Sequence, residues 1–294
     1  MKRESTNPVI TPEMVKPSAP GFRVRGVFNP GATLYNGEII LLLRVSEDCE
    51  AREGFAAVPT VHIENDRGRP DVFEVALDDP DVRLKDTRGV VYKDQDYLST
   101  MSHIRLARSS DGVNFVVEDE PFLFPSNTSE VYGVEDARIT KIEDTYYINY
   151  TCVSQNSWAT ALAETRDFRK VERRGIIFHP ENKDVSIFPE KIKGRYCALH
   201  RPNNSGFGKP SIWFAESPDL IHWGNHRCVL QPRHTYWEEM KIGGGPPCIK
   251  TPEGWLQIYH AKGHNHIYSL FTLLLDLDNP YKVLKQSEDP FFKP

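Results

Sequence analysis

The chain has 294 residues, of which 39% are hydrophobic, enough for one large domain or two smaller ones with a packed core. A net charge of −5 argues against non-specific binding to nucleic acid or to an anionic membrane surface. The 22 prolines and 19 glycines favour many turns and short strands over long helices. The composition therefore indicates a globular chain built from short strands.

The start of the chain and its cysteines indicate a compartment. Residues 1–6 are polar, unlike a secretory signal, and no stretch approaches the roughly 20 apolar residues of a membrane span. The five cysteines form no CxxC pair, and three of them lie in apolar runs. Buried free thiols are typical of a reducing compartment, so we expect a cytoplasmic protein.

A pattern of apolar residues closed by proline recurs along the chain. A first copy ends at Pro12, and four later copies end at Pro125, Pro180, Pro232 and Pro294, with spacings of 55, 52 and 62 residues. A period near 50 residues is typical of the blades of a β-propeller, each of which has four strands. The spacing therefore predicts an all-β fold, a β-propeller with its active site at the central axis.

Each interval repeats the same order of elements. A short innermost segment comes first, expected at 31–34, 136–141, 186–192 and 244–250. The strongest strands follow, at 38–45, 146–152, 195–201 and 255–261. A third strand then ends at a polar turn containing Asp111, Asp167 or Asp219, and a fourth leads to the proline motif. We count four clear blades and expect five, the fifth coming either from 46–101 or from the two termini closing the ring.

The stretch 47–97 is charged and irregular, and it interrupts the first blade between its second and third strands. We interpret it as an insertion that forms a rim or lid. The expected organisation is thus a single catalytic domain over residues 1–294 with a rim insertion at 47–97.

An acidic motif opens the second blade. Strand alternation would place Asp136 and Arg138 on one face and Glu135 on the other. Two readings remain open: a structural Asp–Arg pair, or an acid at the axis whose protonation is set by its neighbours.

Basic residues recur at related positions of the later blades. His260 ends its strand at the phase that Arg201 occupies one blade earlier, and we expect Lys183 and Lys241 to converge with them on an anion pocket. A solvated surface lysine is the alternative for each Lys taken singly. Glycines 243–245 would let the backbone approach a neighbour closely, but the order of a phosphate-binding P-loop is missing.

Metal binding is not expected. His264 and His266 would share one face of a strand, but no third ligand accompanies them. We predict neither a metal nor an organic cofactor.

Taken together, these motifs resemble glycoside hydrolase family 130, which contains β-mannoside phosphorylases and some β-1,2-mannosidases. The resemblance runs from about Asn29 to Pro280 and implies a five-bladed propeller. The motifs that carry it are Asn29-Pro30-Gly31-Ala32, Leu43-Arg44-Val45, Gly133-Val134-Glu135-Asp136-Ala137-Arg138, Asn182-Lys183-Asp184, Phe188-Pro189-Glu190-Lys191, Leu199-His200-Arg201-Pro202, Lys241-Ile242-Gly243-Gly244-Gly245-Pro246-Pro247 and Ile258-Tyr259-His260.

The resemblance also implies roles for individual residues. Asp136 matches the single catalytic acid of the family. The positions that hold phosphate are matched by Lys183, Arg201, Lys241 and His260. Asn29 and Arg44 match contacts to the mannose that is transferred. We also expect substrate binding by Glu135, Arg138 and Glu190, with Glu135 and Arg138 helping to set the protonation of Asp136. One departure is Ala137, where many relatives have proline.

The expected function is inverting, reversible phosphorolysis of a β-mannoside to α-mannose 1-phosphate, with β-1,2-mannobiose or a short β-1,2-mannan as the favoured substrate. Phosphate is already an anion and needs no strong base, whereas inverting hydrolysis needs a second carboxylate to activate water. In the hydrolytic members acids replace some of the phosphate-site cations, whereas this chain has Arg201 and Lys241.

Four alternatives stay open at this point. They are a phosphorylase of β-1,4-mannosyl-glucose or mannosyl-N-acetylglucosamine, a β-1,2-mannosidase that uses water, a sugar-binding propeller without activity, and a furanoside-cleaving propeller using Glu190 and Glu239. The expected partners are a mannose-containing oligosaccharide and phosphate, with no nucleic acid and no membrane. The sequence is compatible with a homo-oligomer.

Overall fold

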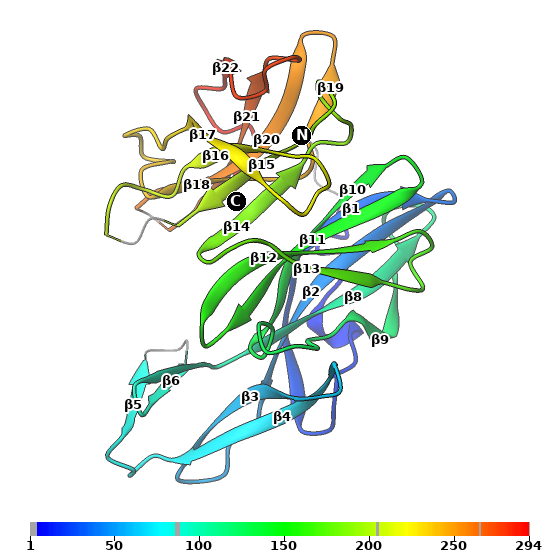
Figure 1. Ribbon diagram of the computed structural model, residues 1–294. Helices are drawn as coiled ribbons and strands as arrows, with labels where there is room; N and C mark the ends of the chain where they lie inside the picture. The colour runs from blue at the N-terminus through cyan, green and yellow to red at the C-terminus, as the bar shows by residue number, and fades with distance from the viewer. Residues whose placement is uncertain (1–4, 86–88, 204–205, 265, 294) are drawn as a thin grey trace. The chain divides into compact units, whose positions relative to one another are not determined.

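The computed structural model describes residues 5–85, 89–203, 206–264 and 266–293 (Figure 1). Throughout these ranges the regular structure is β-strand, and the single helical element is the 3₁₀ turn η1 (Pro12–Met14). The prediction of an all-β chain is confirmed. No helix in the described ranges is long and apolar enough to span a membrane.

The chain divides into two compact units. The N-terminal unit consists of the residues up to Ala137 together with Tyr150–Trp158, and the C-terminal unit consists of Arg138–Asn149 and the residues from Ala159 onward. The first boundary falls inside a strand, directly after Ala137. Each unit is described by itself below.

The N-terminal unit begins with a long antiparallel pair followed by an interruption. Its strands are β1 (Phe22–Tyr35), β2 (Glu38–Cys49), β3 (Phe55–Glu64), β4 (Arg67–Ala76), β5 (Val82–Lys85), β6 (Gly89–Tyr92), β7 (Gln95–Leu98), β8 (Met101–Ser109) and β9 (Val116–Leu123). The order β1-β2-β8 holds one sheet together, with β9 on the outer side of β8. Strands β3–β4 and β5–β6–β7 form two separate small sheets between β2 and β8 in sequence.

Strand β2 is longer than predicted. It was expected to end at Val45, with an irregular stretch from Glu47, but it continues to Cys49 and pairs with β8 as far as Glu47↔Met101. Glu47 is fully buried and accepts hydrogen bonds from the backbone and hydroxyl of Ser18. In the sequence, a charged residue interrupts the apolar pattern and suggests that the strand has ended. Hydrogen bonds can nevertheless satisfy a buried carboxylate inside a strand.

Three strands contribute residues to both units, and they are β10 (Gly133–Ile142), β11 (Thr145–Ser154) and β12 (Ser157–Thr165). In the sheet order they follow β8, and β13 comes after them. The strands that lie wholly in the C-terminal unit are β13 (Glu172–Phe178), β14 (Asn182–Ile187), β15 (Tyr196–Pro202), β16 (Ile212–Ser217), β17 (Gly224–Leu230), β18 (Lys241–Gly244), β19 (Ile249–Thr251), β20 (Gly254–Lys262), β21 (Tyr268–Leu275) and β22 (Val283–Gln286).

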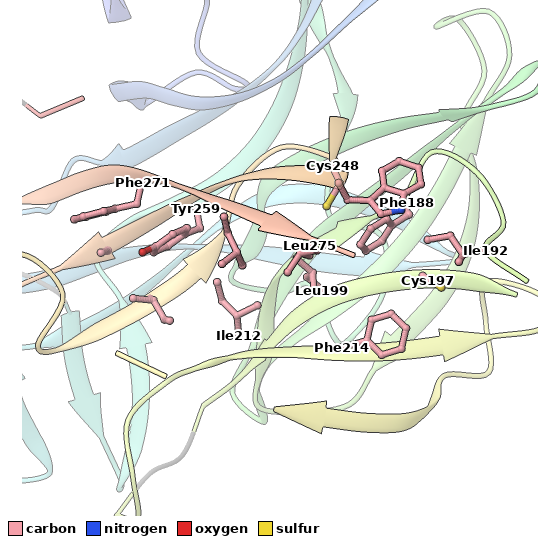
Figure 2. Packing of buried hydrophobic residues seen from close by; sticks show 14 residues of the cluster. Phe188, Ile192, Cys197, Leu199, Ile212, Phe214, Cys248, Tyr259, Phe271 and Leu275 are labelled. Carbon is pink, nitrogen blue, oxygen red and sulfur yellow. The ribbon is translucent and has the colours of Figure 1, made fainter. Parts of the chain in front are cut away.

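The C-terminal unit contains two sheets of antiparallel strands. One has the order β14-β15-β16-β17, and the other has the order β18-β20-β21-β22 with β19 on β20 (Figure 1). Buried aromatic and aliphatic side chains from both sheets pack in a common core (Figure 2). Within it, Phe188 contacts Trp255 edge to face and Tyr259 stacks on Phe271. This packing fixes the two sheets of the unit against each other.

The strands that were expected to be innermost begin and end earlier in the chain than predicted. The segment expected at 186–192 is β14, which ends at Ile187, and the segment expected at 244–250 is β18, which ends at Gly244. The prediction followed apolar residues, whereas the real strands begin with the polar motifs at Asn182 and Lys241. Pro189 lacks the N–H needed to continue the ladder of β14. The basic candidates Lys183 and Lys241 therefore lie in strands, although both precede the segments expected from the sequence at 186–192 and 244–250.

The polar turns expected after each third strand share one hydrogen-bonding pattern. Strands β8, β12 and β16 end at Ser109, Thr165 and Ser217. Two residues later the carboxylate Oδ1 of Asp111, Asp167 or Asp219 accepts hydrogen bonds from two following backbone N–H groups. Such turns reverse the chain because the side chain replaces a backbone acceptor.

Candidate functional site

Asp136 lies in the N-terminal unit at the centre of a group of polar side chains that we call the Asp136 cluster, formed by Asn29, Arg44, Glu135 and Asp136. Asn29 Nδ2 donates to Asp136 Oδ1 over 3.0 Å, and Arg44 Nη1 donates to the same oxygen over 3.1 Å. Arg44 Nη2 donates to Glu135 Oε1 over 2.7 Å. The structure thus brings four of the predicted site residues together.

A break in strand geometry brings Glu135 and Asp136 to the same guanidinium. Asp136 has φ = 50°, in the left-handed region, so side chains do not alternate regularly at this point of β10. The prediction that Glu135 and Asp136 would point to opposite faces was therefore wrong, since Arg44 contacts both carboxylates. The contact seen for Arg138 is to Asp184, as described below.

Arg44 is held in place from β1 and β8. Its Nε donates to Ser102 Oγ over 3.0 Å, and its guanidinium carbon lies 4.8 Å from the centre of the Phe28 ring. Phe28 is the register partner of Arg44, and the ladder shifts between Phe28 and Gly31. Asn29 lies in this shift with φ = 47°, which aims its amide at Asp136. Ser102 and Phe28 were not predicted as site residues.

A second group lies in the C-terminal unit, and we call it the Asp184 cluster; it consists of Arg138, Asp184, Arg201 and His260. Arg201 Nη1 lies 2.6 Å from Asp184 Oδ2, and His260 Nε2 lies 3.2 Å from the same oxygen. Arg138 Nη2 donates to Asp184 Oδ1 over 3.3 Å, and Arg138 Nη1 donates to the Val185 carbonyl. Cations from β10, β15 and β20 thus meet at one carboxylate of β14.

The register of the strands explains this convergence. Lys183 of β14 is paired with Arg201 of β15, and His260 of β20 is paired with Gly243 of β18. The β14–β15 ladder shifts after Lys183, and Asp184 has φ = 55°. This local break turns the Asp184 carboxylate toward Arg201, the register partner of Lys183, and toward His260.

Lys241 and Lys183 belong to the same basic region. Burial lowers the pKa of Lys241, and the positive charges of Arg201 and Lys183 lower it further. Like charges affect a pKa in this way only when they lie close together. The four cations predicted to converge, Lys183, Arg201, Lys241 and His260, are therefore all in this part of the C-terminal unit.

Asp184 is ionised within this region. Burial by itself would raise the pKa of its carboxyl group, but the charges of Arg201, His260 and Arg138 outweigh burial and hold the pKa well below its usual range. A buried carboxylate that is shared by several cations is a stable negative charge and a poor proton acceptor at neutral pH.

Gly243 lies where the β18 backbone passes the cluster. A Cβ atom at this position would lie 2.3 Å from Asp184 Oδ2 and 2.8 Å from His260 Nε2. The close approach expected of the three glycines is therefore made, at Gly243, to the carboxylate and imidazole of the cluster.

Glu190 lies in a different environment from the other predicted residues. It follows β14, is about half exposed and pairs with Lys250 Nζ at 2.5 Å. Glu239 precedes β18 and lies 3.3 Å from His264 Nε2. The furanoside alternative placed both carboxylates on innermost strands, and neither residue lies in a strand. In the described ranges, no group of three or more His, Cys, Asp and Glu side chains is arranged to hold a metal ion.

Sequence reasoning missed Asp184. It was part of a quoted motif but received no role, because its three partners lie 46, 17 and 76 residues away along the chain. The one available signal was an acid placed directly after a lysine expected in an anion pocket.

Comparison with known proteins gives a consistent picture. A family model described as beta-1,4-mannooligosaccharide phosphorylase of glycoside hydrolase family 130 matches residues 48–294. The chain is 43% identical to a beta-1,2-mannobiose phosphorylase from Listeria innocua over 99% of this chain and 83% of that protein. It is 39% identical to a 1,2-beta-oligomannan phosphorylase from Thermoanaerobacter over 67% of this chain and 66% of that protein.

A solved structure is equally similar. The structure of the beta-1,2-mannobiose phosphorylase from Listeria innocua in complex with beta-1,2-mannobiose superposes with a TM-score of 0.92. The superposition covers 99% of this chain and 83% of that one at 43% identity.

Proposed function

The chain belongs to glycoside hydrolase family 130, a family of β-mannoside phosphorylases, and we propose on this premise that it cleaves short β-1,2-mannosides with inorganic phosphate. Membership confirms the family and the phosphorylase class expected from the motifs. The proposal adds the linkage, the residue roles and the stereochemical course.

The observation that carries the proposal is the gathering of cations in the C-terminal unit. Arg201 and Lys241 lie with Lys183 and His260, and the family resemblance implies acids in place of some of these cations in a hydrolase. Guanidinium and ammonium groups suit a phosphate dianion, because they supply charge-assisted hydrogen bonds in a partly buried site. We assign Lys183, Arg201, Lys241 and His260 to phosphate.

Asp136 is the acid in this proposal. Asn29 and Arg44 both bind Oδ1, and the transferable proton would sit on the other oxygen, Oδ2. The acid protonates the departing acceptor sugar, directly or through a hydroxyl of the mannose. A phosphate oxygen forms the new bond to the anomeric carbon from the opposite face as the glycosidic bond breaks, which gives α-mannose 1-phosphate with inversion.

The remaining predicted residues support sugar binding. Arg44 and Asn29 are proposed to contact the transferred mannose, and Glu135 and Arg138 to assist from their places in the two clusters. Glu190 is the weakest member of this set, since it pairs with Lys250. No organic cofactor or metal enters the reaction as proposed.

The β-1,2 linkage is favoured by the whole-chain similarity to the Listeria innocua enzyme. The second candidate is a β-1,4-mannoside phosphorylase, because the matching family model is described by that activity.

The fold proposed for the whole chain is a five-bladed propeller. Its support is the sequence repeat, the four consecutive strands β14–β17, and the sheet β18-β20-β21-β22. The strands β3–β7 would then be the insertion in the first blade, placed between β2 and β8. Residence in the cytoplasm stays a prediction.

The decisive experiment incubates the purified protein with β-1,2-mannobiose in the presence and absence of phosphate. We expect equimolar mannose and mannose 1-phosphate with phosphate, and no cleavage without it. The anomeric proton signal should identify the α-anomer. Mannose release that does not depend on phosphate would establish a hydrolase. Phosphorolysis of β-1,4-mannobiose but not of β-1,2-mannobiose would establish the second candidate.

A further inference from the structure

Asp184 is the point at which the cations of the C-terminal unit are tied together. Its side chain is 9% exposed, and its two oxygens are divided between partners. Oδ1 contacts Arg138, while Oδ2 contacts Arg201 and His260. Burying a carboxylate costs free energy unless it is paired, so these contacts stabilise the buried negative charge of Asp184.

The contacts orient the two cations that are expected to meet phosphate. Arg201 is 3% exposed and contacts Asp184 through Nη1, which restrains its guanidinium group. His260 turns Nε2 toward the carboxylate, 3.2 Å from Oδ2. An acid that contacts a histidine or arginine on the side away from its ligand orients that side chain, and this orientation raises the affinity for the ligand.

Gly243 limits the same arrangement from the side of β18. Its α-carbon leaves room for the Asp184–His260 contact, and a methyl group there would lie 2.3 Å from Oδ2. The atoms met by that methyl group are the ends of two side chains, so they would have to move while the strand can stay in place.

We propose that Asp184 is a positioning residue for phosphate, which holds Arg201 and His260 in the geometry that receives the attacking anion. This proposal rests on the proposed function, since it assumes that these cations bind phosphate. Asp184 does not act as a base, because its pKa is held well below the usual range and three cations surround it. Its role is to orient Arg201 and His260 and to supply a fixed negative charge, and it transfers no proton.

The test uses two variants that disturb the contact differently. Asp184→Asn keeps the shape and removes the charge, whereas Gly243→Ala keeps every charge and displaces the carboxylate and the imidazole. For both we expect the KM for phosphate to rise about 10- to 100-fold, as for other residues that orient a ligand-binding group. The KM for β-1,2-mannobiose at saturating phosphate should change less than about twofold in Gly243→Ala. In Asp184→Asn, which also removes the charge that Arg138 contacts, it should rise less than the KM for phosphate.

The matched control is Glu47→Gln in the N-terminal unit. Glu47 is also a buried carboxylate with a histidine neighbour, His103, at 3.4 Å. This variant should lower the melting temperature and leave the KM for phosphate unchanged. A general loss of packing would instead lower activity in all variants without separating the two substrates.

Calorimetric titration with inorganic phosphate alone tests the positioning role of Asp184 separately from the proposed phosphorolysis. If the wild type binds phosphate and both variants bind it more weakly, the positioning role stands even where no mannoside is turned over, and only the proposed function fails. If folded Asp184→Asn and Gly243→Ala proteins bind phosphate as the wild type does, the inference is overturned. If Asp184→Asn does not fold, Gly243→Ala decides.

Discussion

Three polar residues of the candidate site have a left-handed backbone. Asn29, Asp136 and Asp184 have φ between 47° and 55°. This conformation is uncommon for residues other than glycine, although Asn and Asp adopt it more readily than most. Each of the three has a side chain bound within its cluster. The local strain is offset by these contacts, and it aims the side chains where a regular strand would not.

At this scale the first prediction concerns Asp136. Asp136→Asn keeps the size of the side chain and can still accept hydrogen bonds from Asn29 and Arg44 through Oδ1. It removes the acid, so we expect phosphorolysis to fall by about 10²- to 10⁴-fold. The measurement is the initial rate of mannose 1-phosphate release. The exposed Asp144→Asn serves as control and should keep the wild-type rate, and near-normal activity of Asp136→Asn would remove this residue from the mechanism.

The sequence predicted single residues better than contacts. Asp136 could be named because its motif resembles that of the catalytic acid of the family. The four cations could be named because they lie in related segments of the later repeats and match the family's phosphate positions. Asp184 could not, because its role depends on partners from β10, β15 and β20 that only the folded register brings together. The shared contact of Glu135 and Asp136 with Arg44 depends on a positive φ that strand alternation does not foresee.

At the level of elements, the repeated polar turn is the most regular feature. In the turn after β16, Ser217 Oγ and Asp219 Oδ1 lie 3.1 Å apart. Asp219 Oδ1 accepts from the N–H groups of Ile221 and His222. The strand ends could be predicted here because a hydroxyl residue followed by aspartate is a local signal. The beginnings of β14 and β18 could not, because those strands start with charged residues that are stabilised by distant partners.

The second prediction belongs to this turn. Asp219→Ala removes the acceptor of two backbone N–H groups, so we expect the midpoint of thermal unfolding to fall by roughly 2–4 °C. Asp219→Asn keeps Oδ1 as an acceptor and should lose less. Differential scanning calorimetry measures both. Equal midpoints for wild type and Asp219→Ala would mean that the hydrogen bonds of this turn add nothing to stability.

For the molecule as a whole, buried histidine links stability to pH. His200 is 4% exposed, and its ring nitrogens lie 2.9 Å from Asn182 Nδ2 and 3.0 Å from His226 Nδ1. Burial, together with the smaller effects of the nearby His226 and His179, lowers the pKa of His200 to about 3. The unfolded chain has a histidine of normal pKa, so it binds more protons than the folded chain between pH 6.5 and about 3.

The third prediction follows from this difference. The free energy of unfolding should fall as the pH is lowered through this window, and from pH 6.5 to pH 5 His200 should contribute a loss of about 2 kcal/mol. In His200→Gln this part of the pH dependence should disappear, although the variant is less stable at pH 7. Urea unfolding at both pH values measures it. The exposed His62→Gln is the control, and an unchanged slope in His200→Gln would show that other groups cause the loss.

The convergence of β10, β15 and β20 on Asp184 has a consequence for how the protein is made. No peptide cut from the chain can bind phosphate in the proposed way unless it reaches from Lys183 to His260. On the ribosome, a nascent chain would gain this capacity only after His260 has emerged and found its partner strand. Anion affinity would then report that synthesis and maturation of the C-terminal unit are complete.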